Sequence, residues 1–241
     1  MEQQNGKAHS LVSQVMDRLV ADIVEERYNG TLPPQDVLSR EFDVSRTVMR
    51  EALSMLLARD MLVVRPKVGT RVRPMRDWRM IDEDVVTWRF RAKPDPQFVR
   101  DVIEFRMLIE PPAASQAARR ACREEVEGIR AAYERMTDPT LSDAQYEAAD
   151  ELLHTRIVLA SGNQFLQQMA TIVSCALRLA NRPMLGLKHE RETGLLTHGA
   201  VVRAIEQRDA EGAEQAMRRL IDHTASVLQI HASEFPAGNA A

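Results

Sequence analysis

The sequence predicts a mainly α-helical protein built from two domains. Three observations predict it. Short helical patterns near the N-terminus give way to two short runs with β-strand character, and from residue 79 onward helical patterns continue almost to the end of the chain. The basic residues are concentrated in the first of these regions. We therefore assign residues 1–76 to an N-terminal domain and residues 77–241 to a C-terminal helical domain.

The N-terminal domain begins with three predicted helices. Pairs of apolar residues recur every four positions over residues 11–24, which predicts an amphipathic helix that ends near Gly30. After two consecutive prolines, residues 35–42 have the pattern of a short second helix. Asp43 then makes a tight turn, and Ser45 is the predicted N-cap of the third helix.

The pattern then changes from helical to extended. Residues 61–64 predict one strand, residues 67–70 a hairpin turn and residues 71–73 a returning strand. Three short helices followed by a two-stranded ribbon form a winged helix-turn-helix, a fold that places a helix in the major groove of DNA.

The rest of the chain is predicted to be an all-α helical bundle. Prolines, glycines and polar turns separate the apolar-periodic segments, and a bend or break is expected at Pro111–Pro112. The predicted helices cover residues 79–91, 96–121, 123–137, 141–161, 164–181, 191–208 and 210–232.

Composition restricts the class of protein. The chain is 44% hydrophobic and 28% charged, as in ordinary globular proteins, and no apolar run approaches the roughly 18 residues of a membrane span. The first ten residues are polar and do not resemble an export signal, so we expect a cytoplasmic protein without a membrane partner. Cys122 and Cys175 lack metal-ligand or redox spacing and are expected to be reduced thiols.

Positive charge is concentrated in one segment although the net charge is only −3. Residues 44–79 contain nine Lys and Arg residues against three acidic residues. This asymmetry indicates an anion-binding module attached to a neutral or acidic body.

The third helix carries the predicted base-reading residues. Arg46 and Arg50 are four positions apart and project from the face opposite Leu53 and Leu57. An arginine can donate two hydrogen bonds to the guanine edge, so one of the two is predicted to read a base of operator double-stranded DNA. For any single arginine, a purely solubilising role is the alternative. The full predicted DNA-binding set is Arg40, Ser45, Arg46, Thr47, Arg50, Lys67, Gly69, Thr70 and Arg71.

Residues with metal-ligand chemistry recur in the C-terminal domain. Asp150 and His154 are four positions apart and share a helix face, and His198 and His223 lie on two later helices. One carboxylate with two or three imidazoles suits a divalent metal ion such as Zn, Ni, Mn or Fe. Taken singly, each of these side chains is more often a hydrogen-bonded core or surface residue, so spacing alone leaves metal binding open.

The N-terminal motifs resemble those of a known family. Leu32–Pro33, residues 42–53 and residues 69–72 are similar to the DNA-binding domain of the GntR family of bacterial regulators. Members of that family often have an arginine at the start of the second helix, where this chain has Asp36. Either Arg40, one turn later, replaces that contact or the contact is absent.

The C-terminal motifs resemble the FCD effector domain of the FadR branch of that family, in residues 104–111, 150–163 and 198–209. The resemblance implies that Asp150, His154 and His198 bind a divalent metal. The final histidine of the family would fall at Leu220, so His223 is displaced by three residues, about one helical turn.

An effector site is predicted beside the metal. Arg106 offers a planar two-point fork for a carboxylate, and its alternative role is an ion pair with Glu110 one turn away. Residues 78–88 are similar to the interdomain region of repressors that control hexonate and hexuronate catabolism. A hydroxylated sugar acid is therefore the favoured effector.

These interpretations together predict a homodimeric transcription repressor that a small carboxylate effector releases from operator DNA. One alternative is a metal-dependent enzyme with an accessory nucleic-acid-binding module, although the sequence contains no HExxH, GxSxG or Gly-rich phosphate motif. A second alternative is an architectural DNA-binding protein that has no effector.

Overall fold

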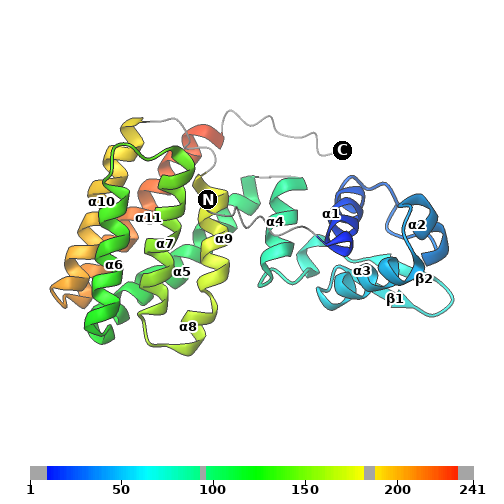
Figure 1. The fold of residues 1–241 in the computed structure, drawn as a ribbon, viewed down its shortest axis with the longest axis horizontal. Helices are drawn as coiled ribbons and strands as arrows, with labels where there is room; N and C mark the ends of the chain where they lie inside the picture. The colour runs from blue at the N-terminus through cyan, green and yellow to red at the C-terminus, as the bar shows by residue number, and fades with distance from the viewer. Residues whose placement is uncertain (1–9, 93–95, 182–187, 233–241) are drawn as a thin grey trace, which may run out of the picture. The chain divides into compact units, whose positions relative to one another are not determined.

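The computed structural model describes residues 10–92, 96–181 and 188–232. The chain divides into two compact units, residues 1–94 and residues 95–241 (Figure 1). Among the described residues, no helix is both long enough and apolar enough to cross a membrane.

The N-terminal unit has the predicted order of three helices and a hairpin. The two strands pair antiparallel, with Leu62 opposite Val72 and Arg65 opposite Gly69. The predicted winged helix-turn-helix is confirmed. Its elements are α1 (Leu11–Val24), α2 (Gln35–Glu41), α3 (Arg46–Ala58), β1 (Leu62–Arg65) and β2 (Gly69–Val72), followed by the short 3-10 helix η1 (Met75–Asp77) and by α4 (Glu83–Ala92).

The turn between α2 and α3 is built as the sequence predicts. Asp43 has a φ of 52°, and the amide of Val44 donates to the carbonyl of Ser39 at 3.0 Å, which completes a Schellman ending for α2. The side chain of Ser45 then accepts from the amide of Val48 at 3.2 Å and caps α3. These two local motifs fix the start of the predicted recognition helix.

Helix α4 packs with the N-terminal unit. Val85 and Trp88 are buried in the same core as α1 and α3, and Trp88 Nε1 donates to Asp17 Oδ1 at 2.6 Å. At the end of α3, Arg59 pairs with Asp82 at 3.2 Å and with Asp84 at 2.7 Å. Residues 77–92 therefore pack with the first unit. The domain boundary that we predict between residues 76 and 77 stays a prediction.

The C-terminal unit is an all-α bundle in which α6, α7, α9, α10 and α11 lie side by side (Figure 1). The predicted fold class is confirmed. The helices are α5 (Pro96–Arg120), α6 (Arg123–Met136), α7 (Asp143–Leu159), α8 (Gln164–Gln168), α9 (Ala170–Asn181), α10 (Lys188–Glu206) and α11 (Ala210–Ala232).

Two details of the bundle differ from the sequence pattern. Helix α5 continues through Pro111 and Pro112, so the helix is not broken at the position where the sequence predicts a bend or break. The predicted helix over residues 164–181 is divided at Met169, the C-cap of α8, whose amide donates to Leu166 at 2.9 Å. A bond of this i to i−3 type tightens the last turn of α8 and ends it.

Small side chains bring α5 and α11 close together. Ala114, Ala117 and Ala118 on α5 are fully buried in the same core cluster as Ala213 and Ala216 on α11. Side chains at a helix contact set the distance between the axes, so alanines allow a close approach. This packing fixes α5, which carries Arg106 and Glu110, within the bundle.

Replacing Arg59 by methionine tests the packing of α4. The change keeps an apolar stem but removes both ion pairs, and we expect the N-terminal unit to lose about 1–2 kcal/mol of unfolding free energy. Both tryptophans of the chain, Trp78 and Trp88, lie in this unit, so urea unfolding of the full chain followed by tryptophan fluorescence reports on it. The matched control is Arg76→Met, since Arg76 is 86% exposed. Equal midpoints for both variants would contradict the packing role.

Candidate metal centre and DNA-binding face

Three side chains with metal-ligand chemistry converge inside the bundle. Asp150 and His154 extend from one face of α7, and His198 extends from α10. All three are buried, and one ligand atom of each lies within 4.8 Å of the other two. The structure thus brings together three of the four residues that the sequence singled out.

The ligand atoms are close enough to share one ion. Asp150 Oδ1 lies 2.7 Å from His198 Nε2 and 3.6 Å from His154 Nε2. The two Nε2 atoms are 3.1 Å apart. Two ligands about 2.1 Å from one zinc ion at octahedral or tetrahedral angles lie roughly 3.0–3.4 Å from each other, and the three separations lie on either side of this range or within it, so that small side-chain movements would let all three atoms share one ion.

The other nitrogen of each imidazole is already used. His198 Nδ1 donates to the carbonyl oxygen of Gly194 at 2.6 Å, and His154 Nδ1 donates to the carboxylate of Glu110. A carbonyl and an ionised carboxylate can only accept, so both protons of the neutral rings lie on Nδ1. In neutral rings of this tautomer, both Nε2 lone pairs would face Asp150 Oδ1, so that three acceptor atoms would meet. A bound cation would satisfy all three atoms, and second-shell bonds of this kind orient histidine ligands.

His223 is not part of this group. It is partly buried on α11, and among the described residues the cluster of metal-ligand atoms contains only Asp150, His154 and His198. The displacement of His223 from the family position, noted in the sequence, accounts for this because a shift of three residues moves a side chain one turn along its helix.

Glu110 links Arg106 to the cluster, because its carboxylate contacts both Arg106 and His154. Arg106 Nε donates to Glu110 Oε1 at 2.6 Å, and both side chains are almost completely buried. Burial by itself would raise the pKa of Glu110, but the positive charge of Arg106 and the contact with His154 lower that pKa to about 2. The ion pair expected as the alternative role of Arg106 is therefore present.

This ion pair uses only one of the three guanidinium nitrogens of Arg106. Nη1 and Nη2 are buried and have no hydrogen-bond partner within the described part of the chain. Buried donors left unsatisfied cost roughly 1–3 kcal/mol each, and more when they carry charge. The pair of nitrogens has the fork geometry that binds a carboxylate with two parallel hydrogen bonds.

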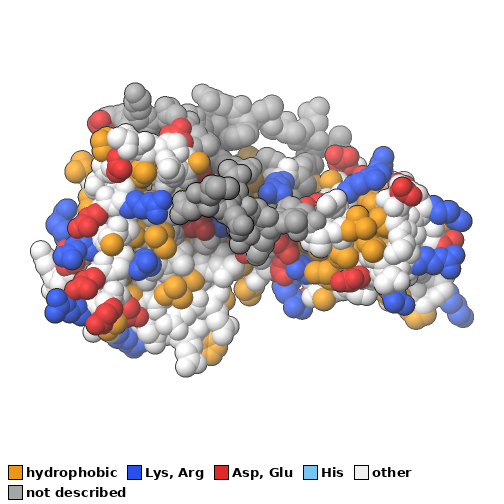
Figure 2. Space-filling model, viewed as in Figure 1, with side chains coloured by type: hydrophobic (Ala, Val, Ile, Leu, Met, Phe, Trp, Pro, Cys, Tyr) orange, Lys and Arg blue, Asp and Glu red, His pale blue; other side chains and the backbone are white. Residues whose placement is uncertain are grey.

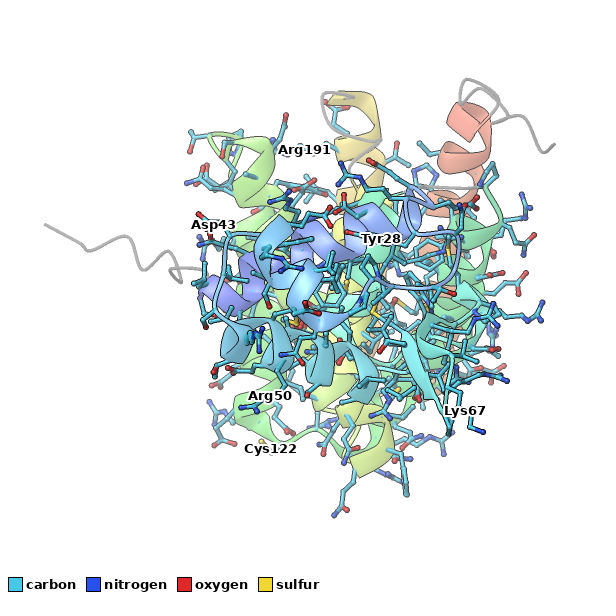
Figure 3. All side chains as sticks on the ribbon, turned by 90° about the vertical axis from the view of Figure 1, so that its right-hand side faces the viewer. Tyr28, Asp43, Arg50, Lys67, Cys122 and Arg191 are labelled. Carbon is cyan, nitrogen blue, oxygen red and sulfur yellow. The ribbon has the colours of Figure 1, made fainter. Side chains whose placement is uncertain are left out.

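The predicted DNA-contact residues lie on exposed parts of the N-terminal unit. Arg46 and Arg50 on α3 are exposed, as are Lys67 and Arg71 on the hairpin, and none of these four side chains forms an ion pair with any residue described. Lys and Arg side chains stand out on the surface of this unit in Figure 2. Figure 3 shows Arg50 and Lys67 reaching the lower edge of the unit from α3 and from the hairpin. Ser45 and Thr47 are also exposed, whereas Thr70 is half-buried.

The tip of the hairpin holds a lysine in a strained conformation. Lys67 has a φ of 62°, and the amide of Val68 donates to the carbonyl of Arg65 at 3.1 Å, which closes the turn. The left-handed region costs a side chain about 1 kcal/mol relative to glycine. Gly69, with a φ of 101°, avoids that cost two residues later.

Arg40 pairs with the acidic residue noted in the sequence. Its Nη2 lies 3.3 Å from Asp36 Oδ2, and the two side chains are 74% and 46% exposed. Exposed pairs of this kind contribute about 0–1 kcal/mol, so a phosphate can compete with Asp36 for Arg40.

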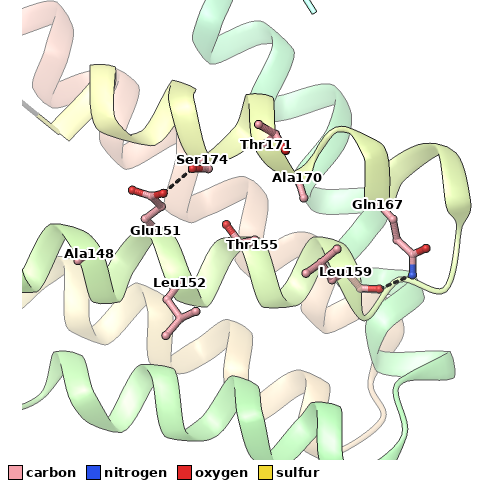
Figure 4. Close-up of a pocket in the computed structure, with 9 residues that line it drawn as sticks. All are labelled: Ala148, Glu151, Leu152, Thr155, Leu159, Gln167, Ala170, Thr171 and Ser174. Carbon is pink, nitrogen blue, oxygen red and sulfur yellow. Dashed lines mark hydrogen bonds between the residues drawn. The ribbon is translucent and has the colours of Figure 1, made fainter. Parts of the chain in front are cut away.

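A separate groove lies between α7 and the α8–α9 segment (Figure 4). It has a volume of about 480 Å³. On its wall Ser174 donates to Glu151 at 2.5 Å, and Gln167 donates to the carbonyl of Leu159 at 2.7 Å. None of the metal-cluster residues lines it, so the groove is not part of the candidate metal centre.

Sequence reasoning missed the partners that orient the histidines. Glu110 was considered only as a partner of Arg106, although it also contacts His154, which lies 44 residues further along the chain. Gly194 contributes a backbone carbonyl, which no side-chain pattern reveals. The spacing of four between Gly194 and His198 is the only local signal for that bond.

Replacing Glu110 by glutamine tests the buried network. The change leaves Arg106 without a counter-charge, and we expect a loss of about 3–5 kcal/mol of unfolding free energy. Urea unfolding in the presence of a chelator, followed by far-ultraviolet circular dichroism, measures it. Glu134→Gln is the matched control, because the pair of Glu134 with Arg130 is exposed and spans 3.7 Å. A loss for Glu110→Gln no larger than that of the control would contradict the role of the network.

Two family models match the chain. The model described as "Bacterial regulatory proteins, gntR family" matches residues 11–72, and the model of the FCD domain matches residues 101–223, more than half of the chain. The two matches fall on the winged helix-turn-helix and on the helical bundle.

Similar proteins with these two parts are bacterial transcription regulators. The galactonate operon transcriptional repressor of Escherichia coli is 28% identical over 212 residues, which cover 85% of this chain and 93% of that protein. The Uxu operon transcriptional regulator of the same bacterium is 28% identical over 211 residues, covering 81% and 77%.

Two solved structures have a similar fold. A Streptococcus agalactiae GntR structure aligns with a TM-score of 0.51 and 25% identity, covering 90% of this chain and all of that one. The Listeria monocytogenes protein Lar aligns with a TM-score of 0.59 at 17% identity, covering 93% of this chain and 100% of that one. The chain thus belongs to the GntR family of bacterial transcription regulators, with a winged helix-turn-helix that binds DNA and an FCD domain, and is not an enzyme.

Proposed function

We propose that this regulator represses a sugar-acid catabolic operon and leaves its operator when a carboxylate effector binds beside a divalent metal ion in the FCD domain. The observation that carries the proposal is the convergence of Asp150 Oδ1 with the Nε2 atoms of His154 and His198, near Arg106, whose Nη1 and Nη2 have no partner among the described residues. The galactonate and Uxu operon regulators support the effector class, since their names link them to sugar-acid operons.

On the DNA side, the exposed cations divide into two roles. Arg46 and Arg50 extend from α3 and would read guanine edges in the major groove. Lys67 and Arg71 on the hairpin would contact phosphates, which fix position without reading sequence. The position of Lys67 at the exposed tip of the hairpin supports a role in binding, since its charge can reach a phosphate there.

On the effector side, Asp150, His154 and His198 would hold the metal ion. A bound Zn²⁺, or alternatively Ni²⁺, Mn²⁺ or Fe²⁺, supplies open coordination positions for a carboxylate and a neighbouring hydroxyl. Arg106 would bind the same carboxylate through Nη1 and Nη2, while Glu110 holds the guanidinium in place through Nε.

Release from DNA requires that the effector prefer one conformation. We infer a homodimer in which two recognition helices match two operator half-sites. The effector would bind more tightly to dimers in which the distance between the two recognition helices does not match the half-site spacing. It would thereby increase the fraction of dimers that cannot bind the operator. Helix α4 packs on α1 and α3, so a movement of α4 would carry the recognition helix with it.

Replacing Lys67 by glycine separates folding from DNA binding. We expect the N-terminal unit to gain up to about 1 kcal/mol of stability because glycine adopts a positive φ without strain. Affinity for a duplex carrying an operator obtained by in vitro selection should fall, and the slope of log affinity against log salt should shrink by about 0.9 for each lysine removed.

Glu26→Gly is the matched control for Lys67→Gly. Glu26 is also exposed and has a φ of 57°, but it carries no positive charge. The control should gain similar stability without loss of DNA affinity. An unchanged salt slope for Lys67→Gly would contradict a phosphate contact.

Zinc should stabilise the native protein after chelator treatment. Saturating Zn²⁺ at about 100 times its dissociation constant adds about 2.7 kcal/mol, which corresponds to an increase in melting temperature of roughly 5 °C or more. Asp150→Asn and His198→Ala should remove this shift in a thermal melt, whereas His223→Ala should keep it. A shift lost only in His223→Ala would contradict the three-residue site.

A further inference from the structure

We propose that Glu110 is a positioning residue for the metal ion, because its buried carboxylate holds both the guanidinium of Arg106 and the Nδ1 proton of His154 and so keeps His154 Nε2 available for coordination. The inference rests on the proposed function, since the ion is the one assigned to Asp150, His154 and His198. It goes beyond that function by making the metal affinity depend on a residue that does not touch the metal.

Each oxygen of the Glu110 carboxylate has one donor. Oε1 accepts from Arg106 Nε at 2.6 Å, and Oε2 contacts His154 Nδ1. A guanidinium can only donate and an ionised carboxylate can only accept. His154 Nδ1 therefore carries its proton toward Glu110, which in the neutral ring leaves Nε2 for a metal ion.

Burial makes His154 dependent on this one acceptor. Glu110 is 0% exposed, and Arg106 and His154 are each 1% exposed, so bulk water does not reach the three side chains. Within the described part of the chain, Glu110 is the only hydrogen-bond partner of His154 Nδ1. The side chain at position 110 therefore decides which nitrogen of His154 carries the proton.

The other imidazole is supported in a different way. His198 Nδ1 donates at 2.6 Å to the carbonyl of Gly194, one turn earlier on the same helix, α10. A backbone carbonyl stays in place when side chains are changed. His154 lies on α7 and Glu110 on α5, so of the two histidines only His154 relies on a side chain from another helix.

A glutamine at position 110 could satisfy only one of the two donors. It has one acceptor oxygen, and its amide nitrogen can only donate. Charge-assisted hydrogen bonds are the stronger ones, so Arg106 should take the oxygen and the amide nitrogen should face His154. His154 would then have to accept at Nδ1 and carry its proton on Nε2, where the proton blocks the metal.

Zinc affinity of the full-length protein, measured by competition with a chromophoric chelator, tests the inference. We expect Glu110→Gln to bind Zn²⁺ about 10–100-fold more weakly than the native protein, the range typical for loss of a partner that orients a metal ligand. The matched control is Glu151→Gln on α7, which also removes the charge of an ion-paired carboxylate. Glu151 pairs with Arg178 at 2.8 Å rather than with a histidine, so the control should keep the native affinity.

A spectroscopic measurement separates positioning from a general loss of structure. In metal-free protein with nitrogen-15 histidine, proton–nitrogen correlation spectra show whether Nδ1 of each ring carries a proton, and His154→Gln identifies the signals of His154. We expect His154 Nδ1 to carry a proton in the native protein and to lack it in Glu110→Gln. His198 should be the same in both, because its acceptor is a backbone carbonyl.

Two double variants keep the test decisive if Glu110→Gln does not fold. Arg106→Met combined with Glu110→Gln and Arg106→Met combined with Glu110→Met both remove the buried ion pair, a change that proteins often tolerate. Only the first retains an oxygen that can accept from His154. It should therefore bind Zn²⁺ about 10–100-fold more tightly than the second.

Three results would each overturn the inference and leave the proposed function intact. They are equal zinc affinities in the two double variants, native affinity in a folded Glu110→Gln, and a proton that stays on His154 Nδ1 in that variant. Failure of the native protein to bind Zn²⁺ would instead contradict the proposed function, and this inference with it.

Discussion

A network of buried charge is the constraint on which the structure of the C-terminal unit depends. Arg106, Glu110, His154, Asp150 and His198 form a continuous chain of contacts inside a helical bundle from which water is largely excluded. Buried charges are tolerated only when partners satisfy them, and here the protein satisfies one end of the network and leaves the other open. The Nδ1 atoms bond to Glu110 and Gly194, the Nε2 atoms converge on Asp150 Oδ1, and the Nη atoms of Arg106 have no partner among the described residues. The proposed binding of a cation and an anion together would satisfy these groups.

In contrast to the buried network of the C-terminal unit, the charged side chains on α3 and the hairpin are exposed in the N-terminal unit. Its cations on α3 and the hairpin are solvated and unpaired among the residues described, so they remain available to a polyanion. The acidic partners of this unit are found elsewhere, where Asp17, Asp82 and Asp84 hold α4 against the helices that support α3. The same sequence region therefore contains both the exposed cations and the helix α4 that packs with α1 and α3.

Much of the fold could be predicted because its signals are local. Helical periodicity, the N-cap Ser45 and the turn at Asp43 lie within a few residues of the elements they define. The pairing of Asp150 with His154 follows from a spacing of four. No sequence pattern predicts contacts that depend on helix packing across 44 or more residues. Two such contacts are that of Glu110 with His154 and the stacking of Arg191 on Tyr146. The bond of His198 to the carbonyl of Gly194 involves the backbone, which no side-chain pattern reveals. The continuity of α5 through Pro111–Pro112 also reflects tertiary packing, since Pro111 and the alanines that follow it are buried.

The central claim is that one site holds a metal ion and a carboxylate on the groups that the protein leaves unsatisfied. A crystal structure with zinc and a sugar acid, with anomalous scattering measured at the zinc edge, tests it most directly. We expect a single strong anomalous peak bonded to Asp150 and to the Nε2 atoms of His154 and His198, with a carboxylate on Nη1 and Nη2 of Arg106. A peak outside this cluster, or an acid bound without contact to Arg106, would contradict it.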